Sequence, residues 1–420
     1  MTKHKKLALV VTGAFALCGA SAAHAFNVKA GDWDLSMSGE VNAFYSYTQC
    51  QNNARAIIGG TTCGTTFTNG ASSVESGLLP SALVFSAKTT QEGFDIGVTF
   101  GFYPGINNGG QVSGANTSAA ALPQPSALGS TGIDMRQNFF TFGDKDMGTI
   151  KMGRDLGFFG SDAILSDMTL LGVGTPQSPQ NPGNTTLGRI GIGYAYADWI
   201  PQISYISPSF GGGFQVSAGI FQPFNMIGGE VLTNHSMPMI QAKGTWDFNS
   251  DSVKGRVWVG GLEQRATNAA DNNDGATGLG GELGAKASMA GFDGLIYAYT
   301  GYGLGTTGIF LNGISATGSR RHSDGGYAQL QYTIGKWKPG FSYGFSQLKA
   351  AGGEQAANPN LVAFNRSAVG QLQYSLTKSL TLLGEYAHSW TTAQGANPTP
   401  ALNSSKNIEN SFSVGGILFF

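Results

Sequence analysis

Apolar and polar side chains alternate along most of this chain, in segments of about ten residues separated by stretches rich in turn-forming residues. A period of two is typical of β-strands with one apolar and one polar face. No stretch sustains the helical period, and past residue 25 no apolar run approaches the length of a membrane helix. The pattern therefore predicts an all-β protein. Clear alternation runs through 33–48, 94–102, 189–196, 328–334, 371–376 and 411–420.

The connections between these strands fall into two classes of length that alternate along the chain. Seven short turns and eight long loops join 16 strands, an even number that places both chain ends on one side of a closed sheet. The short turns are expected at 90–93, 143–148, 208–213, 249–252, 290–291, 335–339 and 377–379. The long loops are expected at 50–80, 104–132, 155–187, 222–238, 266–278, 303–321, 350–364 and 391–407.

The two strand faces indicate where lipid and water lie. Apolar faces carry Tyr, Phe and Trp near strand ends, whereas the opposite faces carry Gln, Ser, Thr, Gly and scattered charges. A soluble β-sandwich turns its apolar faces inward, but aromatic ends and unequal loops fit a barrel with lipid outside and water inside. Closure leaves no unsatisfied sheet edge in lipid, and about 16 strands enclose more space than side chains fill. We expect a 16-stranded antiparallel transmembrane β-barrel over 26–420, with short periplasmic turns and long outer loops.

Composition excludes the ordinary alternatives to such a barrel. The 420 residues include 64 glycines and only 12% charged residues, which is not typical of a soluble enzyme. An aromatic fraction of 11% with a net charge near zero is not typical of a disordered chain. The composition therefore agrees with an exported β protein.

The first 25 residues have the features of a cleaved signal peptide, and we expect the mature chain to begin at Phe26. The apolar stretch is shorter than the roughly 20 residues of a membrane anchor. Cleavage would lower Lys plus Arg from 24 to 21 against 25 Asp plus Glu, a formal charge of −4, so no nucleic-acid partner is expected. The signal features are the basic residues Lys3, Lys5 and Lys6, the apolar stretch 7–17 and the small-x-small motif Ala23-His24-Ala25.

Cys50 and Cys63 are the only cysteines of the expected mature chain, with twelve residues between them. In an exported protein they are predicted to form a disulfide that closes the first long loop, with two free thiols as the alternative. They are too few for a four-ligand zinc site. An outer-membrane hydrolase would need an activated serine with a histidine in reach, and none is found, so no catalytic residue is expected. No cofactor or metal is expected either.

Several stretches carry a family resemblance, namely Met135–Gly143 followed by Gly148–Arg154, then Gly188–Tyr194, Ser207–Gly212 and the terminal aromatic Phe420. In this order they resemble Gram-negative trimeric outer-membrane porins. The resemblance implies a passive diffusion channel for ions and small hydrophilic solutes, in the outer membrane, as a homotrimer surrounded by lipopolysaccharide. It also implies that Phe420 is read by the outer-membrane assembly machinery.

The resemblance further implies a constriction made by the third long loop, 155–187, folding into the barrel against basic residues of the wall. Arg136 and Arg189 occupy the basic wall positions, and both are expected to point inward. Asp167, with Asp162 beside it, is the candidate for the acidic side of the loop.

Three further charged residues complete the predicted constriction. Arg154 has the parity of the lipid-facing Ile150 and Met152, and an arginine at the bilayer midplane costs roughly 2 to 4 kcal/mol. We therefore expect the strand to end before Arg154 and the loop to turn inward there. Glu40 is expected inward on the first strand and Lys88 on the second.

Other functions remain open from the sequence alone. A substrate-selective channel would use inward aromatic residues such as Phe44, Phe140 and Phe142 as a track for its solute. A secreted or surface adhesin of the β-solenoid type would show a fixed internal repeat. The unequal lengths of the loops argue against such a repeat.

Overall fold

The structure is a computed structural model that describes residues 26–51, 56–63, 70–106, 133–176, 184–268, 275–395 and 406–420. The predicted signal peptide, 1–25, lies outside the described residues. Nearly all regular structure is β, and the described residues contain no helix long and apolar enough to cross a membrane.

The first half of the wall consists of strands from β1 to β12, with a short helix α1 and a 3₁₀ helix η2 between β7 and β8. The bounds are β1 Phe26–Ala30, β2 Trp33–Gln51, β3 Gly70–Glu75, β4 Ala82–Gln91, β5 Phe94–Pro104, β6 Ile133–Asp144, β7 Gly148–Leu156, α1 Ser161–Ser166, η2 Met168–Leu171, β8 Trp199–Ile206, β9 Phe214–Phe221, β10 Met226–Gly228, β11 Val231–Leu232 and β12 Met239–Asn249.

The second half runs from β13 to β21 and includes a one-turn helix, α2, in an outer loop. The bounds are β13 Val253–Thr267, β14 Gly275–Met289, β15 Phe292–Tyr302, β16 Leu311–Ile314, β17 His322–Tyr332, β18 Trp337–Lys349, α2 Glu354–Ala357, β19 Val362–Ser375, β20 Leu380–Ala393 and β21 Lys406–Phe419.

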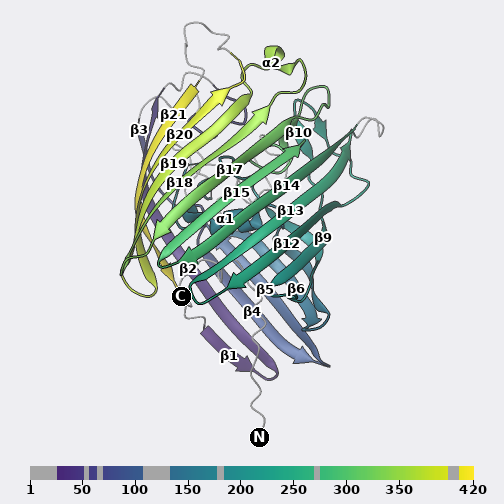
Figure 1. Cartoon of the computed structure of the whole chain (residues 1–420), viewed down its shortest axis with the longest axis vertical. Coiled ribbons are helices and arrows are strands. Elements are labelled where there is room, and N and C mark those ends of the chain that lie inside the picture. Colours follow the sequence, from purple (N-terminus) through teal and green to yellow (C-terminus); the bar gives the residue numbers. More distant parts are fainter. Residues whose placement is uncertain are drawn as a thin grey trace.

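The wall is a closed antiparallel barrel, as predicted (Figure 1). Each wall strand pairs with the next, and β21 returns to β2 over the whole register from Glu40↔Phe419 to Gln51↔Ile408. The second wall strand is divided, since β4 pairs with the lower part of β2 and β3 with its upper part. Counting β3 and β4 as one strand, and setting aside β1, β10, β11 and β16, the barrel has the expected 16 strands.

The predicted alternation of turns and loops is also confirmed. All seven short turns lie at one end of the barrel, at the predicted positions to within a few residues. The described parts of the long connections start from the other end, where α2 and β10 are seen in Figure 1. The first described strand, β1, and the C-terminus both lie toward the short-turn end, as an even strand number requires.

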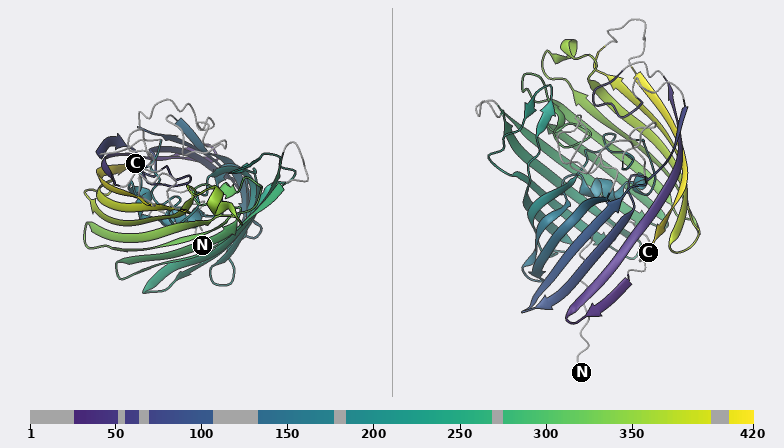
Figure 2. Two further views of the ribbon diagram at one scale, coloured as in Figure 1. Left: turned by 90° about the horizontal axis from the view of Figure 1, so that it is seen from above. Right: turned by 180° about the vertical axis from the view of Figure 1, so that it is seen from behind.

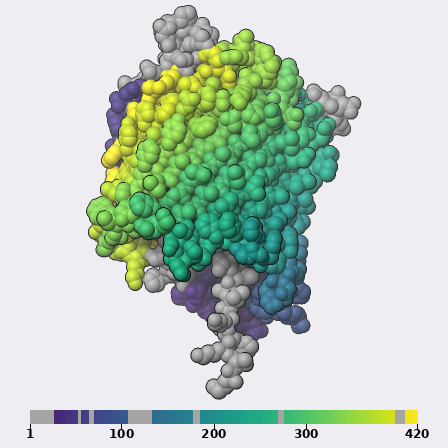
Figure 3. Space-filling model, viewed as in Figure 1, coloured from purple at the N-terminus to yellow at the C-terminus, as the bar shows by residue number. Residues whose placement is uncertain are grey.

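Side chains alternate across the wall as the period of two requires. On β2, Val41, Tyr45 and Tyr47 are exposed on the outer face, whereas Asn42 and Ser46 are buried on the inner face. Figure 3 shows the outer side chains of β12 to β20 as a continuous wall on the face in view. Apolar groups therefore meet the membrane, and polar groups line the interior.

The interior is filled over much of its width by the chain's own loops. A large apolar cluster lies inside the ring, made from the β7–β8 connection, the inner side of β12 to β17 and the outer loops. The outer loops add a small separate sheet in which β10 pairs with both β11 and β16. Any solute path is therefore much narrower than the ring of strands.

Candidate functional site

The connection between β7 and β8 turns into the lumen and carries α1 and η2 across it. Both views of Figure 2 place α1 within the ring of strands. This is the inward-folded loop predicted at 155–187, but it continues to Asp198 before the wall resumes at Trp199. Nothing in the loop is described between 176 and 184.

The prediction of a wall strand through 189–196 is wrong. Ile190, Ile192 and Tyr194 are completely buried, and the segment forms turns and isolated bridges inside the barrel. The apolar residues of the alternating pattern are buried, but Ile190 and Tyr194 pack into the apolar cluster inside the barrel and not against lipid. Arg189 was expected on the wall, but it belongs to the inward loop.

Backbone groups of the loop are held by side chains of the facing wall. Gln241 Oε1 on β12 accepts hydrogen bonds from the amides of Phe158 and Phe159, at 2.7 and 2.9 Å. Glu282 Oε2 on β14 accepts from the Gly160 amide at 2.8 Å, and the Tyr327 hydroxyl on β17 donates to the Ala163 carbonyl at 2.6 Å. These bonds satisfy buried backbone groups that would otherwise be costly, so the loop is fixed to the wall.

Asp162 ties α1 to the wall by charge. Its Oδ2 lies 2.5 Å from Lys243 Nζ, and its Oδ1 lies 2.9 Å from Arg256 Nη1. Arg256 also pairs through Nε with Asp247, at 2.6 Å. Burial opposes ionisation of Asp162, but the two cations and their hydrogen bonds hold its pKa well below the usual range. The predicted acidic residue is therefore an ionised group clamped between two wall cations.

Asp167 caps η2 and faces Arg189. Its Oδ1 accepts from the Thr169 amide at 2.9 Å, and its Oδ2 accepts from the hydroxyls of Thr169 and Tyr194, at 2.7 and 2.8 Å. Arg189 is fully buried, and its Nη1 donates to the Ser367 carbonyl at 3.3 Å. Burial raises the pKa of Asp167, and the Arg189 charge opposes that rise. The predicted acidic and basic residues thus both belong to the inward loop, and the charge of Arg189 acts on Asp167.

Arg136 lies on β6 and points inward, as predicted. Its Nε donates to Asp134 Oδ2 at 3.0 Å, and its guanidinium lies 5.2 Å from the centre of the Tyr103 ring. Both Arg136 and Asp134 are buried, and the charge of Arg136 interacts with the Tyr196 side chain of the loop. Arg136 is therefore a wall cation at the level of the loop.

The prediction that the strand ends before Arg154 is wrong. β7 continues to Leu156, and Arg154 pairs with Asn138 in the outward phase of the sheet. Its Nη1 donates to the Trp199 carbonyl at 2.9 Å. Arg154 therefore lies on the outside of the barrel, away from the lumen.

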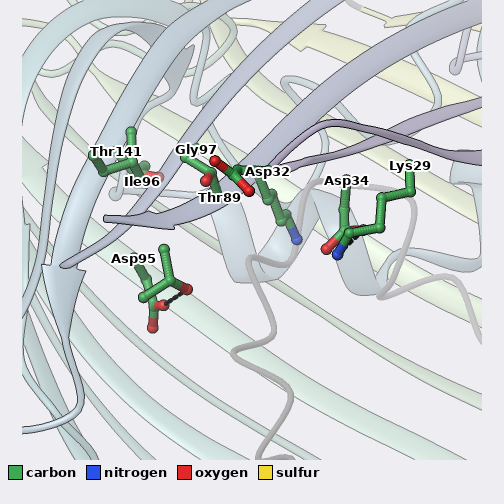
Figure 4. Close-up of a pocket in the computed structure, with 10 residues that line it drawn as sticks. Lys29, Asp32, Asp34, Thr89, Asp95, Ile96, Gly97 and Thr141 are labelled. Atoms are coloured by element: carbon green, nitrogen blue, oxygen red, sulfur yellow. Dashed lines mark hydrogen bonds and ion pairs between the residues drawn. The ribbon is translucent and has the colours of Figure 1, made fainter. Parts of the chain in front are cut away.

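Glu40 and Lys88 have separate surroundings. Glu40 is fully buried on the inner face of β2, where Asn42 Nδ2 donates to its carboxylate at 3.1 Å. Lys88 is exposed near the β4–β5 turn and lines a pocket of about 430 Å³. Asp34 and Asp95 line the same pocket and are labelled in Figure 4. No residue of the inward loop lines that pocket. The structure therefore does not bring Lys88 to the loop.

The aromatic track expected for a substrate-selective channel is mostly absent from the lumen. Phe44 is buried on the inner face, but Phe140 is 45% exposed and pairs with the outward Val98, and Phe142 shares its phase. The cause is a bulge, because Gly101 pairs with Gln137 and Phe102 with Met135. Arg136 and Gln137 both point inward, so the parity reverses for the rest of the strand.

The predicted disulfide between Cys50 and Cys63 is confirmed, with Cα atoms 6.0 Å apart. Glu409 of β21 lies beside it, and its Oε2 accepts from the Cys63 amide at 3.0 Å. These three side chains are close enough to share a metal ion, but the bridged sulfurs offer no thiolate. The chain end is also paired, since the Phe420 amide donates to the Gly39 carbonyl at 3.0 Å.

A water-accessible chamber of about 1100 Å³ lies between the loop and the short-turn end of the barrel. Loop residues from Leu165 to Leu171 form its roof, and inner-face residues of β12 to β20 form much of its wall. Its charged lining is six basic residues against three acidic ones, a difference of +3. The basic residues are Lys254, Arg256, Lys286, Lys336, Lys338 and Lys378, and the acidic ones are Asp167, Asp247 and Asp293.

Several residues of this site were not predicted from the sequence. Lys243, Arg256, Glu282 and Glu385 all have inward side chains that contact the loop. The signal available in the sequence was that each is a charged residue on the polar face of a strand. The sequence pattern does not give the height of each residue in the barrel, so it could not select those that meet the loop.

The family model of the Gram-negative porins matches residues 8–394 of this chain. No curated protein matches the sequence. Among solved structures, the chain resembles the outer membrane channel DcaP of Acinetobacter baumannii, at 14% identity and a TM-score of 0.66 over 94% of this chain and 99% of that one.

Two other solved structures share the fold. An anion-selective porin from Comamonas acidovorans is 13% identical, with a TM-score of 0.57 over 92% of this chain and all of that one. A trimer form of in-vitro folded OmpT of Vibrio cholerae is 12% identical, with a TM-score of 0.51 over 92% and 99%. Together with the family match, the closed 16-stranded barrel and its inward loop show that this chain belongs to the Gram-negative porins, the passive diffusion channels of the outer membrane.

Proposed function

We propose that this porin sieves small hydrophilic solutes by size and weakly favours anions. The observation that carries the preference is the lining of the chamber below the loop, with its excess of three positive charges. The fold relative from Comamonas acidovorans is itself described as anion-selective. Size selection follows from the loops that occupy the lumen, because they leave only part of the barrel's width to solutes.

The preference for anions is expected to be weak. Two unit charges about 10 Å apart interact by roughly 0.4 kcal/mol in bulk water and roughly 1.7 kcal/mol at an effective dielectric near 20. Salt at physiological strength screens this over about 8 Å. Three excess charges therefore bias permeation by a few fold and do not bind a solute tightly.

The narrow level of the pore is proposed to lie at the inward loop. Asp162, Asp167 and Arg189 hold the loop in place, and Arg136 faces it from the wall. Glu40 belongs to the same inner surface, whereas Lys88 acts at the short-turn mouth. In this proposal the buried pairs fix the shape of the constriction, and the chamber lysines set the sign of its field.

The assembly is proposed to be a homotrimer embedded among outer-membrane lipids and lipopolysaccharide. One fold relative is recorded in a trimer form. The terminal Phe420, held by backbone pairing with Gly39 at the barrel seam, is proposed to be the residue that the assembly machinery reads.

The charge preference is tested by reversal potentials of the purified protein in planar bilayers under a KCl gradient. Replacing Lys254 and Lys336 by Glu changes the lining from +3 to −1, so the wild type should favour chloride and the variant potassium. Lys145→Glu is the matched control, because Lys145 lies in a short turn outside the chamber lining. A wild type that favours potassium, or a double variant with an unchanged reversal potential, would contradict the proposal.

A further inference from the structure

We propose that a groove in the outer wall of the barrel binds one acyl chain of a phospholipid in the periplasmic leaflet of the membrane. The groove has a volume of about 520 Å³ and opens on the outward side of β14, β15, β17 and β18, which are neighbours in the sheet (Figure 1). We call it the acyl groove. Its floor and sides are defined by Phe248, Ala285, Ala287, Gly294, Ala328 and Phe341.

The register of the sheet explains why the wall is hollow at this place. In one row of paired residues, the outward positions change from a large side chain to small ones and back to large ones. Ala285 and Ala328 lie in the next row, where both pair with Ile296. The wall therefore recedes almost to the backbone between its larger side chains. The first row consists of Phe248, Gly255, Ala287, Gly294, Leu330 and Phe341.

Aromatic rings form the two sides of the acyl groove. A Cβ atom added to Gly255 would lie 2.4 Å from Cζ of Phe248, so the Phe248 ring lies over this glycine of β13 and borders the groove. On the other side, Phe341 and Tyr343 of β18 are 59% and 41% exposed. Because aromatic side chains are rigid and have only two χ angles, these rings stand beside the floor and leave it open.

The lining of the acyl groove is almost entirely hydrocarbon. Lys286 and Gln329 also border it, but their side-chain nitrogens lie in the lumen, 3.0 Å from Ser166 Oγ and 2.7 Å from the Ser166 carbonyl. These two residues therefore present only backbone and stem atoms to the groove. Among the other lining residues, the hydroxyl of Tyr343 is the one side-chain group that can form a hydrogen bond. Such a surface suits an apolar chain and not a polar headgroup.

The depth of the groove places it in the periplasmic leaflet. The short turns of such barrels face the periplasm, and Ala285 and Ala287 precede the turn at Ala290 on the same strand. At about 3.4 Å per residue and a tilt of about 40°, they lie roughly 8 to 13 Å above the turn. Phe292 and Tyr332 lie between groove and turn, with ring centres 4.4 Å apart. Aromatic girdles mark the membrane interface, so the groove begins just inside the hydrocarbon.

An acyl chain is the occupant that this depth and chemistry select. The groove is continuous with the apolar wall that meets the membrane. Its volume is in the range of small-molecule sites, roughly 300 to 1,000 Å³, whereas a protein partner needs a broad surface of about 800 Å² on each side. Small residues allow close approach to the backbone, and close contacts supply the attraction inside a membrane. A flexible acyl chain can therefore follow the concave floor and fill it.

Native mass spectrometry of the full-length protein in detergent, with added dioleoyl phosphatidylethanolamine, tests this assignment. The wild type should retain one phospholipid per chain. Ala287→Phe with Ala328→Phe fills the groove and should lower the retained fraction by about tenfold, the change that a loss of 1.4 kcal/mol produces. Ala242→Phe is the matched control, because Ala242 is an exposed alanine of β12 outside the groove. Equal unit conductance shows that the variants fold. Equal retention by the filled variant and the control would overturn the proposal.

Photo-crosslinking identifies the occupant directly. Phe341, at the side of the groove, is replaced by p-benzoylphenylalanine, which keeps the aromatic ring. Illumination of the protein in native outer membranes should give a phospholipid adduct on the peptide that contains position 341, detected by its mass. Adducts with lipopolysaccharide, with a second copy of the chain or with another protein, or no phospholipid adduct at all, would overturn the proposal.

Discussion

At the scale of single residues, Asp198 stands out at the point where the inward loop returns to the wall. It has a left-handed backbone, with φ of 54°, and its side chain accepts from the Trp199 amide at 2.6 Å. Burial raises its pKa from the ordinary 3.8 to about 7, although the Trp199 hydrogen bond and the charges of Arg154 and Arg136 oppose the rise. The folded protein therefore keeps a proton on Asp198 that an unfolded chain releases near pH 4.

The raised pKa of Asp198 predicts a stability that falls with rising pH. Its favourable contribution is complete below pH 3.8 and is lost as the pH rises to about 7. An Asp198→Asn variant, which keeps the acceptor and cannot ionise, should match the wild type at pH 4 and unfold at a higher temperature at pH 8. A pKa that is about three units higher in the folded than in the unfolded state changes the free energy of unfolding by about 4 kcal/mol at most. Thermal unfolding in detergent, followed by circular dichroism, measures this; equal midpoints at pH 8 would contradict it.

At the scale of elements, the inward loop depends on wall side chains that accept its backbone amides. Gln241→Leu would leave the Phe158 and Phe159 amides buried without an acceptor, at a cost of about 1 to 3 kcal/mol each. Hydrogen exchange should then increase in 157–166, with the wall strands unchanged. Gln241→Glu keeps the acceptor and is the control. Unchanged exchange in the Leu variant would show that other contacts are enough to hold the loop.

The wall elements could be predicted from the sequence, and the contents of the lumen could not. A period of two reports that one face of a segment is apolar, but not what covers that face. Lipid covers the apolar face of β2, whereas the apolar cluster inside the barrel covers the apolar face of 189–196. Both segments have the same alternating pattern, so the second was wrongly predicted to be a wall strand. The bulge opposite Gly101 reverses the parity within β6, so Arg136 was placed correctly and Phe140 was not. Loop contacts between distant strands leave no periodic signal.

At the scale of the whole molecule, the barrel requires outward side chains in the middle of the wall to contact acyl chains or another copy. Spin labels at Val98 and Phe100, introduced through single cysteines, should be accessible to oxygen and protected from a water-soluble nickel reagent. A label at Glu92, in the β4–β5 turn, should show the reverse. The native cysteines do not interfere because they are joined to each other. Water-accessible labels at Val98 would refute the barrel's orientation.

The disulfide of the first long loop has a consequence for the order of assembly. Cys50 lies next to the last residue of β2, and Cys63 forms hydrogen bonds with Glu409 and Asn407 of the last strand, β21. The covalent ring therefore fastens the junction where the end of the chain meets its beginning. The disulfide loop can bind Glu409 and Asn407 only after β21 has joined the barrel. The thiols can therefore be oxidised early, but the contacts between the disulfide loop and β21 form last.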